Sequence, residues 1–346
     1  MKQKIRQWPK IELHCHLDGS IRRETFRRMA EQEGIDCPQS EEELTAYLKA
    51  PADCTSLKEY LEPFGRVGFC MQKTEYLETV TCDCLHQAKE DGIIYQEIRF
   101  APAFSLGKGL SMEDAVRSVI RGIRRGTDET GVESRVILCM MRGRPEIENQ
   151  EVIDTFLSIR RAGGADAMYL GGLDLAGDEA SYPLIWYERL FRKARTEKIP
   201  FTIHAGECGS WENIRCAVRL GARRIGHGIA AAENPEIMRL LNEFQIGVEM
   251  CPTSNYQTRA VQPGREYPLG IFLKKKLRVS LHTDNRTVSD TTLSREYEWA
   301  MEHFPWLQEE DFCRMNLNAL QEAFLPEEKK EELRQKLLRG YESKIN

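Results

Sequence analysis

Short apolar segments rich in β-branched residues recur along the chain, and stretches with helical spacing separate most of them. Most of these segments run into a loop that carries polar or chemically reactive residues. This alternation is typical of βα units around a parallel sheet. The expected strands cover residues 11–16, 93–100, 134–140, 169–175, 200–206, 222–228, 245–251 and 277–283. A closed (β/α)8 TIM barrel needs eight such strands, so we predict an α/β fold of this type.

The connection after the first strand is much longer than the others. It runs from Ser20 to about Asp91 and carries several helical patterns. A long insertion on the loop face of a barrel is a candidate lid. Within it, Leu57, Tyr60, Leu61 and Phe64 have the i, i+3, i+4, i+7 spacing of one helix face. This apolar face indicates either a gate over a ligand or ordinary packing onto the barrel.

Helices are expected at 183–198 and 234–244, the second with Asn234 as its N-cap and Pro235 in its first turn. The Glu- and Lys-rich stretch from Pro326 predicts an amphipathic closing helix. No linker, low-complexity run or fixed-period repeat interrupts this order. We therefore expect residues 1–346 to form a single barrel domain with a helical insertion after strand 1 and extra helices at the C-terminus.

Composition narrows the class of protein. A content of 41% hydrophobic and 30% charged residues is typical of a globular protein with a sizeable core. A net charge of -5 gives no overall basic field, so we expect no nucleic-acid partner. The N-terminus lacks the apolar region of a secretory signal, and no run of about 18 apolar residues follows. We expect no membrane association and no obligate protein partner.

The chain has eleven cysteines, an odd number. Several lie inside apolar stretches, such as Cys139 in VILCMM and Cys251 in VEMCP. Buried free thiols in a reducing, cytoplasmic compartment are the simplest interpretation. Cys82 and Cys84 could form half of a metal site, but no second pair of suitable spacing complements them. We expect these two cysteines to be structural.

Four of the seven histidines fall at the C-terminal ends of expected strands: His14, His16, His204 and His227. In a barrel these ends converge on one mouth. His14 and His16 are two residues apart on a strand, so both point to the same face. With Asp284 from the eighth strand, three imidazole nitrogens and one carboxylate oxygen suit Zn²⁺ and leave a position for water. We predict one zinc ion per chain, held by His14, His16, His204 and Asp284; the alternative for each histidine is a hydrogen-bonded core residue.

Two further residues are placed to handle protons. Glu207 lies three residues beyond His204, on a loop that would cover the metal-bound water, which suits a proton carrier better than another ligand. His227 sits between two glycines in RIGHG. It could receive a proton from, or orient, a water whose pKa zinc lowers toward about 7.

The chain carries, in order, the motifs LHCHLDGS, LDLAGDE, HAGE, IGHG, CPTSN and HTDNR. They resemble the successive motifs of the adenosine deaminase family within the amidohydrolase superfamily, from about Pro9 to Pro326. The resemblance implies zinc-dependent hydrolytic deamination of adenosine, and of 2′-deoxyadenosine, to inosine and ammonia in cytoplasmic purine salvage. The expected partner is a small-molecule purine nucleoside.

The resemblance also implies residue roles. Residues His14, His16, His204 and Asp284 correspond to the zinc ligands. Glu207 corresponds to the proton donor to purine N1, and His227 to the partner of the attacking hydroxide.

Further residues correspond to contacts with the nucleoside. The backbone amide of Gly177 would meet purine N3, and Asp18, together with His16, would hold the ribose 5′-hydroxyl. Asp18 favours a nucleoside over a free base, because adenine-specific relatives commonly carry a longer Glu at this point, which would crowd the ribose. The alternative for Asp18 is a turn residue before Gly19.

Asn285 and His282 differ from many family members. Many of them carry Asp where this chain has Asn285, and an amide always donates whereas a carboxyl donates only when protonated. We predict that Asn285 donates to purine N7. By strand alternation His282 would share the face of Asp284, and we expect a buried supporting or core histidine there, since the site already has four ligands.

Three other functions compete with this interpretation. A relative specialised for adenine, a modified adenosine or aminodeoxyfutalosine would share every zinc residue. A two-metal hydrolase would need a bridging carboxylated Lys or a Glu at the end of the fourth strand, where Asp178 or Glu179 would have to serve. A binding module without catalysis would have no use for Glu207 and His227.

Overall fold

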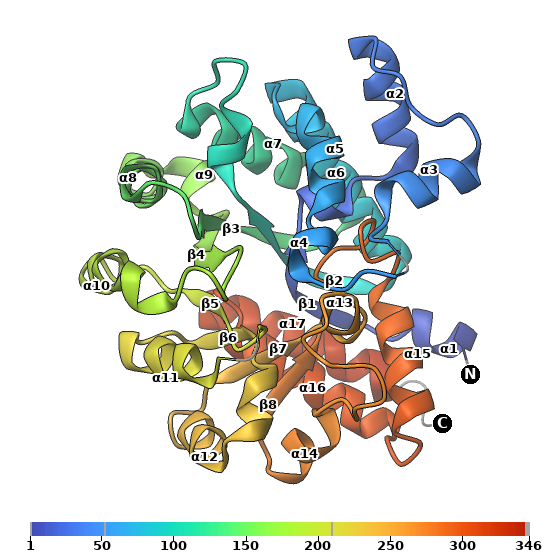
Figure 1. The fold of residues 1–346 in the computed structure, drawn as a ribbon, viewed down its shortest axis with the longest axis vertical. Coiled ribbons are helices and arrows are strands. Elements are labelled where there is room, and N and C mark those ends of the chain that lie inside the picture. Colours follow the sequence, from blue (N-terminus) through green and yellow to red (C-terminus); the bar gives the residue numbers. More distant parts are fainter. Residues whose placement is uncertain (1, 52, 209, 343–346) are drawn as a thin grey trace.

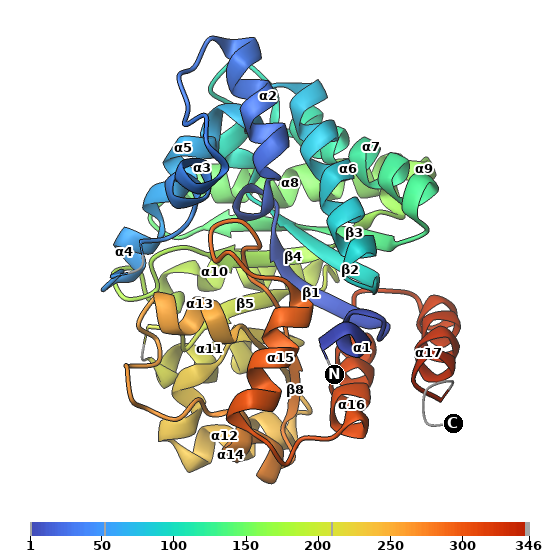
Figure 2. The same ribbon diagram turned by 90° about the vertical axis from the view of Figure 1, so that its right-hand side faces the viewer.

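The computed structural model describes residues 2–51, 53–208 and 210–342. Its centre is a barrel of parallel strands surrounded by helices (Figures 1 and 2). One half of the barrel contains β1 (Lys10–His16), β2 (Ile93–Phe100), β3 (Glu133–Met141) and β4 (Leu170–Ala176), in that order. The other half contains β5 (Thr202–Ala205), β6 (Arg224–His227), β7 (Gly247–Met250) and β8 (Arg278–Leu281). These eight strands confirm the predicted (β/α)8 fold.

The two halves meet along two seams. An isolated parallel bridge pairs Leu173 of β4 with Phe201, just before β5. A second bridge pairs Cys15 of β1 with Asp284, just after β8. Within each half, runs of residues pair between neighbouring strands, with register shifts between β1 and β2 and between β3 and β4, whereas each seam has one isolated bridge. The second seam runs through residues that the sequence places in the active site.

The strands are buried along nearly their whole length, because helices cover the outside of the barrel and side chains fill the inside. The surrounding helices are α6 (Thr74–Glu90), α7 (Met112–Thr130), α8 (Glu146–Ala162), α10 (Glu188–Thr196), α11 (Trp211–Leu220), α12 (Pro235–Glu243), α14 (Leu269–Lys274) and α16 (Glu309–Glu322). Shorter elements between them are η3 (Pro102–Ser105), α9 (Gly164–Ala167), η4 (Leu184–Tyr187), η5 (Ile229–Glu233) and α13 (Pro252–Gln257).

Both expected helices are present, and one of them differs in its first turn. Asn234 caps α12 by accepting from the backbone N–H of Glu236, with Pro235 in the first turn as predicted. The helix expected at 183–198 starts as the 3-10 turn η4 and becomes α-helical only at Glu188. At the end of that turn the Tyr187 hydroxyl accepts from the backbone N–H of Gly143. The tighter winding therefore accompanies a contact with the neighbouring loop.

Helices between β1 and β2 form the predicted insertion. They are η1 (Asp18–Ser20), α2 (Arg23–Glu33), α3 (Glu41–Leu48), α4 (Leu57–Tyr60), α5 (Glu62–Val67) and η2 (Gly68–Met71), before the barrel helix α6. Ser40 and Ser56 cap α3 and α4, which explains why these short helices begin where they do. Figure 2 shows α2, α3 and α5 of the insertion above the strands, and α4 at the left of the view.

The C-terminal segment adds α15 (Leu293–His303), α16 and α17 (Glu327–Glu342), the last being the helix expected from Pro326. Leu333, Leu337 and Tyr341 of α17 are buried, and Tyr341 packs against Trp8, which follows α1 (Lys2–Arg6). Within the described ranges, no helix combines the length and the apolar character needed to cross a bilayer.

Candidate active site

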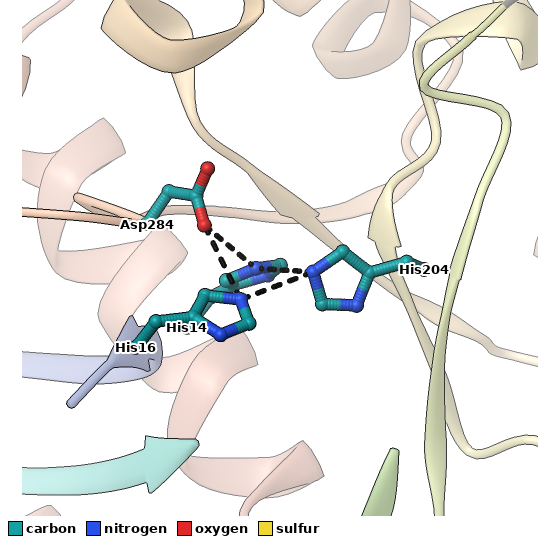
Figure 3. Close-up of side chains that lie close together, drawn as sticks. All are labelled: His14, His16, His204 and Asp284. Atoms are coloured by element: carbon teal, nitrogen blue, oxygen red, sulfur yellow. Dashed lines mark hydrogen bonds and ion pairs between the residues drawn. The ribbon is translucent and has the colours of Figure 1, made fainter. Parts of the chain in front are cut away.

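Four side chains converge where three strands end, as Figure 3 shows. Nε2 of His14 and Nε2 of His16 lie 3.1 and 3.2 Å from Nε2 of His204. Oδ1 of Asp284 lies 3.3 and 3.4 Å from the same two atoms of His14 and His16. Ligand atoms at about 2.0–2.1 Å from a tetrahedral zinc ion would be about 3.4 Å apart. The spacing of these four donors therefore fits one small cation.

Backbone hydrogen bonds explain how Asp284 reaches β1. Its N–H donates to the His14 carbonyl at 2.9 Å, and its carbonyl accepts from the His16 N–H at 2.7 Å. Asp284 has a φ of 60°, which is uncommon for a residue with a side chain. The two backbone bonds hold this conformation, so the same contact that closes the barrel also aims the carboxylate at the histidines.

Carboxylates support two of the histidines from behind. Nδ1 of His14 lies 3.0 Å from Oε2 of Glu249, and Nδ1 of His204 lies 2.9 Å from Oδ2 of Asp174. An imidazole that donates through Nδ1 presents the lone pair of Nε2, which is the arrangement that a metal ligand needs. Asp174 and Glu249 were missed in the sequence, although each is a charged residue inside an otherwise apolar strand.

Arg99 joins the two supporting carboxylates. Its guanidinium donates to Asp174 and to Glu249, and all three side chains are buried. Burial alone would raise the pKa of both carboxyls, but Arg99, together with His204 at Asp174 and with Arg224 and His14 at Glu249, holds each pKa well below the usual range. Both acceptors therefore remain anionic behind the candidate ligands.

Ionisation of the histidines is compatible with cation binding. Burial lowers the pKa of His16 and of His204, which keeps these rings neutral. For His14, burial and Arg99 lower the pKa, but hydrogen bonds to Asp284 and Glu249 outweigh them and raise it. A bound cation would displace that proton.

Glu207 and His227 lie beside this cluster. Oε2 of Glu207 is 3.6 Å from Nε2 of His227, and both side chains are buried. The His227 ring centroid lies 4.8 Å from that of His14 and 5.0 Å from that of His204. Burial, together with the charges of Asp284 and Glu179, raises the pKa of Glu207 to about 8. At neutral pH this carboxyl therefore holds a proton that it is able to donate.

Glu179 orders the loop that carries Glu207. Its carboxylate accepts from the backbone N–H groups of Gly206, Glu207 and Cys208 at 2.6, 2.9 and 3.1 Å. It also accepts from Nδ2 of Asn213 at 2.8 Å. The two-metal alternative would need this carboxylate or that of Asp178 as a ligand, whereas the cluster of possible ligands at the barrel mouth, among the residues described, includes neither.

A cavity of about 430 Å³ opens beside the four donors. This volume is within the range typical of small-molecule sites. Its polar lining includes His16, Asp18, His204, Glu207, His227, Asp284 and Asn285. Leu57, Tyr60, Leu61 and Phe64 of the insertion form part of its apolar wall, together with Met71, Phe104 and Met141. The insertion therefore contributes directly to the site, as the gate interpretation requires.

The residues expected to contact a nucleoside lie around this cavity. Asp18 begins η1, and its Oδ1 accepts from the N–H of Gly19 at 3.1 Å, so it has the turn role as well as a place in the lining. Burial raises the pKa of Asp18 to about 6. Gly177 follows β4 and has a φ of 99°, which favours glycine at this point of the lining.

Asn285 connects the barrel to the insertion. Its Nδ2 donates to the Tyr60 hydroxyl at 2.8 Å, and that hydroxyl is 2.8 Å from Oγ of Ser289. Oδ1 of Asn285 is buried and finds no hydrogen-bond partner in the described part of the chain. A Cβ atom on Gly19 would come within 1.8 Å of this oxygen, so only glycine fits there.

His282 belongs to the core. Its Nδ1 accepts from the N–H of Leu13 at 3.1 Å, and its Nε2 lies 2.7 Å from Oγ of Ser280. β8 ends at Leu281, so the strand alternation that relates His282 to Asp284 in the sequence does not extend that far. His282 thus packs beneath the site as a hydrogen-bonded side chain.

The cysteines are all free thiols. Sγ of Cys82 lies 3.4 Å from Oε2 of Glu129, whereas Cys84 accepts from Arg286 at 3.5 Å. The two thiols therefore have different surroundings and do not act as one half-site. Cys82, His86 and Glu129 form a second group of closely spaced possible ligands on the outside of the barrel.

The family model described as adenosine deaminase matches residues 9–339. An adenosine deaminase of Enterococcus faecalis is 42% identical over 98% of this chain and 99% of its own length. The structure is similar to adenine deaminase from Arthrobacter aurescens, with a TM-score of 0.86, 24% identity and coverage of 96% and 98%. It is also similar to an amidohydrolase from Burkholderia ambifaria with bound Zn, with a TM-score of 0.87, 23% identity and coverage of 99% and 93%.

Proposed function

The chain belongs to the adenosine deaminase family, and we propose that it deaminates adenosine, and 2′-deoxyadenosine, to inosine and ammonia with one zinc ion per chain. It is a hydrolase that acts on a C–N bond. The observation that carries the proposal is the position of Glu207, a buried acid whose pKa is raised to about 8, beside three imidazoles and a carboxylate spaced for one cation.

Zinc is proposed from the donor set. Three imidazole nitrogens with one carboxylate oxygen match the ligands that zinc prefers in catalytic sites. The Burkholderia ambifaria protein of the same fold contains zinc. When bound by His14, His16, His204 and Asp284, zinc would supply a Lewis acid that lowers the pKa of water toward about 7.

Glu207 would supply the proton that activates the purine. Its carboxyl gives its proton to purine N1, which makes C6 electrophilic. The oxygen of water then bonds to C6 as one water proton passes to the Glu207 carboxylate, which gives a tetrahedral intermediate. Glu207 passes that proton to N6 as the C6–N6 bond breaks and ammonia leaves, and the C6 hydroxyl returns its proton to Glu207 as the carbonyl of inosine forms. His227, 3.6 Å from Glu207, lies where it can contact the attacking water.

The remaining lining residues would position the nucleoside. We assign the 5′-hydroxyl of ribose to Asp18 and His16, purine N3 to the backbone amide of Gly177 and N7 to Asn285. The cavity volume of about 430 Å³ and its apolar wall support a ligand of this size and a flat aromatic base. The free thiols support a reducing, cytoplasmic location.

Adenine is the second candidate substrate, because the Arthrobacter aurescens enzyme of the same fold is an adenine deaminase. The experiment is to follow the loss of ultraviolet absorbance when zinc-replete protein meets adenosine, 2′-deoxyadenosine, adenine, AMP or N6-methyladenosine. We expect rapid turnover of the two nucleosides only. Turnover of adenine alone would overturn the nucleoside assignment, and no turnover of any 6-aminopurine would overturn the proposed reaction.

A matched pair of variants makes this experiment specific. Glu207→Gln keeps the shape of the side chain but removes the proton donor, and should abolish turnover without loss of zinc. Glu212→Gln, on the outer helix α11 (Trp211–Leu220), should leave turnover unchanged.

A further inference from the structure

His227 has a different partner from the other buried histidines of the site. Nδ2 of Asn255, in α13, lies 2.9 Å from Nδ1 of His227, and both side chains are buried. Behind His14 and His204, by contrast, the Nδ1 atoms face carboxylates. A carboxylate accepts a hydrogen bond, whereas an amide nitrogen donates one. The partner at Nδ1 therefore separates His227 from the candidate ligands.

Tyr267 fixes which end of the Asn255 amide faces His227. The Tyr267 hydroxyl donates to Oδ1 of Asn255 at 2.9 Å. Burial raises the pKa of Tyr267 well above its ordinary value, and a backbone hydrogen bond from Cys251 opposes that rise, as expected when a peptide N–H donates to the phenol oxygen. The phenol proton is thus directed to Asn255 Oδ1, which leaves Nδ2 to donate to His227.

This hydrogen-bond chain determines the tautomer of His227. An Nδ1 atom that accepts a hydrogen bond carries no proton, so the ring is neutral and its one proton is on Nε2. Nε2 is the atom that faces Glu207 at 3.6 Å. Nε2 of His14 and His204, in contrast, presents a lone pair toward the cation site.

We propose that Asn255 is a positioning residue, which holds His227 as the Nε2–H tautomer so that His227 donates a hydrogen bond to the attacking water instead of taking a proton from it. The inference rests on the proposed deamination. The water proton passes to the Glu207 carboxylate, which is free to accept it once N1 has received the carboxyl proton. His227 gains and loses no proton, and its N–H orients the oxygen toward C6.

The first test reverses the tautomer. Asn255→Asp keeps the size of the side chain and accepts from both Tyr267 and His227, so the His227 proton should move to Nδ1. With a lone pair in place of the Nε2–H donor, kcat for adenosine should fall about 100-fold or more, whereas KM changes little because no substrate contact is altered. A normal kcat in a variant whose tautomer has reversed would overturn the proposal.

A second variant changes the residue that hydrogen-bonds Asn255. Tyr267→Phe removes the hydroxyl that orients the Asn255 amide, so the amide gains the freedom to flip and kcat should fall by a smaller factor. Tyr297→Phe is the matched control, since Tyr297 is equally buried and its hydroxyl bonds Asn316 instead. Equal loss of kcat in both Tyr→Phe variants would show a general packing effect and overturn the proposed role.

The tautomer is measured directly by ¹⁵N NMR of the zinc-loaded native enzyme with labelled histidine, the His227 signals being identified by their absence in His227→Gln. We expect a pyridine-type Nδ1 and a pyrrole-type Nε2, and the reverse pattern in Asn255→Asp. A protonated Nδ1 in the native enzyme would refute the inference even if Asn255→Asp fails to fold. Because the NMR readout does not depend on turnover, failure of the proposed reaction is recognised separately by the absence of inosine.

Discussion

Oδ2 of Asp174 accepts a hydrogen bond from Nδ1 of His204 across 2.9 Å. Arg99 donates to the same carboxylate and to Glu249, which in turn supports His14. One buried guanidinium therefore stabilises the anions behind two candidate metal ligands that come from different halves of the barrel.

Asp174→Asn should weaken metal binding more than it alters the fold. The amide is a weaker acceptor than the carboxylate, so His204 loses basicity and orientation, and metal affinity should fall about 10- to 100-fold. Competition with a chelator measures this change. Asp178→Asn is the control, since the Asp178 carboxylate accepts from Ser181 and from the Ala180 backbone N–H and supports neither His14 nor His204. Reduced metal stoichiometry in Asp178→Asn would support the two-metal alternative instead.

The pH profile should report on Glu207. Burial raises its pKa to about 8, and the protonated form is the proton donor, so the active fraction is full below that pH and is lost as pH rises through it. We expect kcat/KM for adenosine to fall above pH 8 in the native enzyme. A profile that stays flat well above this pH would contradict the assignment of Glu207 as the acid.

Glu179→Gln should loosen the loop around Glu207. The glutamine oxygen is able to replace one carboxylate oxygen, but its NH₂ group would face a backbone N–H donor. Leaving that buried donor unpaired should cost about 1–3 kcal/mol in the free energy of unfolding. The negative charge of Glu179 also helps to raise the pKa of Glu207, so the basic limb of the kcat/KM profile should move to lower pH. Chemical denaturation and the pH profile measure the two effects.

Purine N7 provides a test of Asn285. One amide hydrogen of Asn285 goes to the Tyr60 hydroxyl, and the second is available to a ligand. The 7-deaza analogue of adenosine should bind more weakly by about 1–3 kcal/mol, because its C–H leaves that donor unpaired. Inhibition constants for the 7-deaza analogue and for a matched inhibitor that retains N7 measure the difference in affinity. Equal affinity would remove Asn285 from the proposed N7 contact.

Tyr60→Phe should disturb substrate binding more than chemistry. The Tyr60 hydroxyl is the hydrogen-bonded link between the insertion and Asn285, and its loss should leave the Asn285 amide free to turn. We expect KM for adenosine to rise several-fold while kcat falls less. Tyr47→Phe, in the insertion but outside the cavity lining, serves as the control. A kcat loss at unchanged KM would argue against the role of Tyr60 in binding.

The sequence predicts the strands and the four donors because both depend on local pattern. Alternation along one strand places His14 and His16 on one face, and the topology of a barrel brings His204 and Asp284 to the same mouth. The charged pairs inside the barrel cannot be predicted from such local pattern. Arg224 donates to Glu97 and Glu249, and these pairs join side chains from three strands. Such pairs depend on strand register, which the spacing of residues along one strand does not determine.

The hydrogen-bond partners of His227 could not be predicted from the sequence, for a related reason. CPTSN was visible as a motif, but its Asn255 acts through a hydrogen bond whose direction is set by Tyr267, twelve positions away and beyond a helix. The backbone of Asp284 is another case, since its φ of 60° depends on hydrogen bonds to β1 at the far end of the chain. Long-range contacts, and not residue types, decide these details.

The division of the barrel into two hydrogen-bonded halves has a consequence for how the protein matures. His14 and His16 belong to the half that leaves the ribosome first, whereas His204 and Asp284 arrive with the second half. Two imidazoles alone bind a cation weakly, so a partly synthesised chain would bind zinc or another metal only weakly. The full donor set exists only after the seam at Cys15 and Asp284 has closed. Binding of the proposed zinc would then be a late step in folding, restricted to molecules whose two halves have docked correctly.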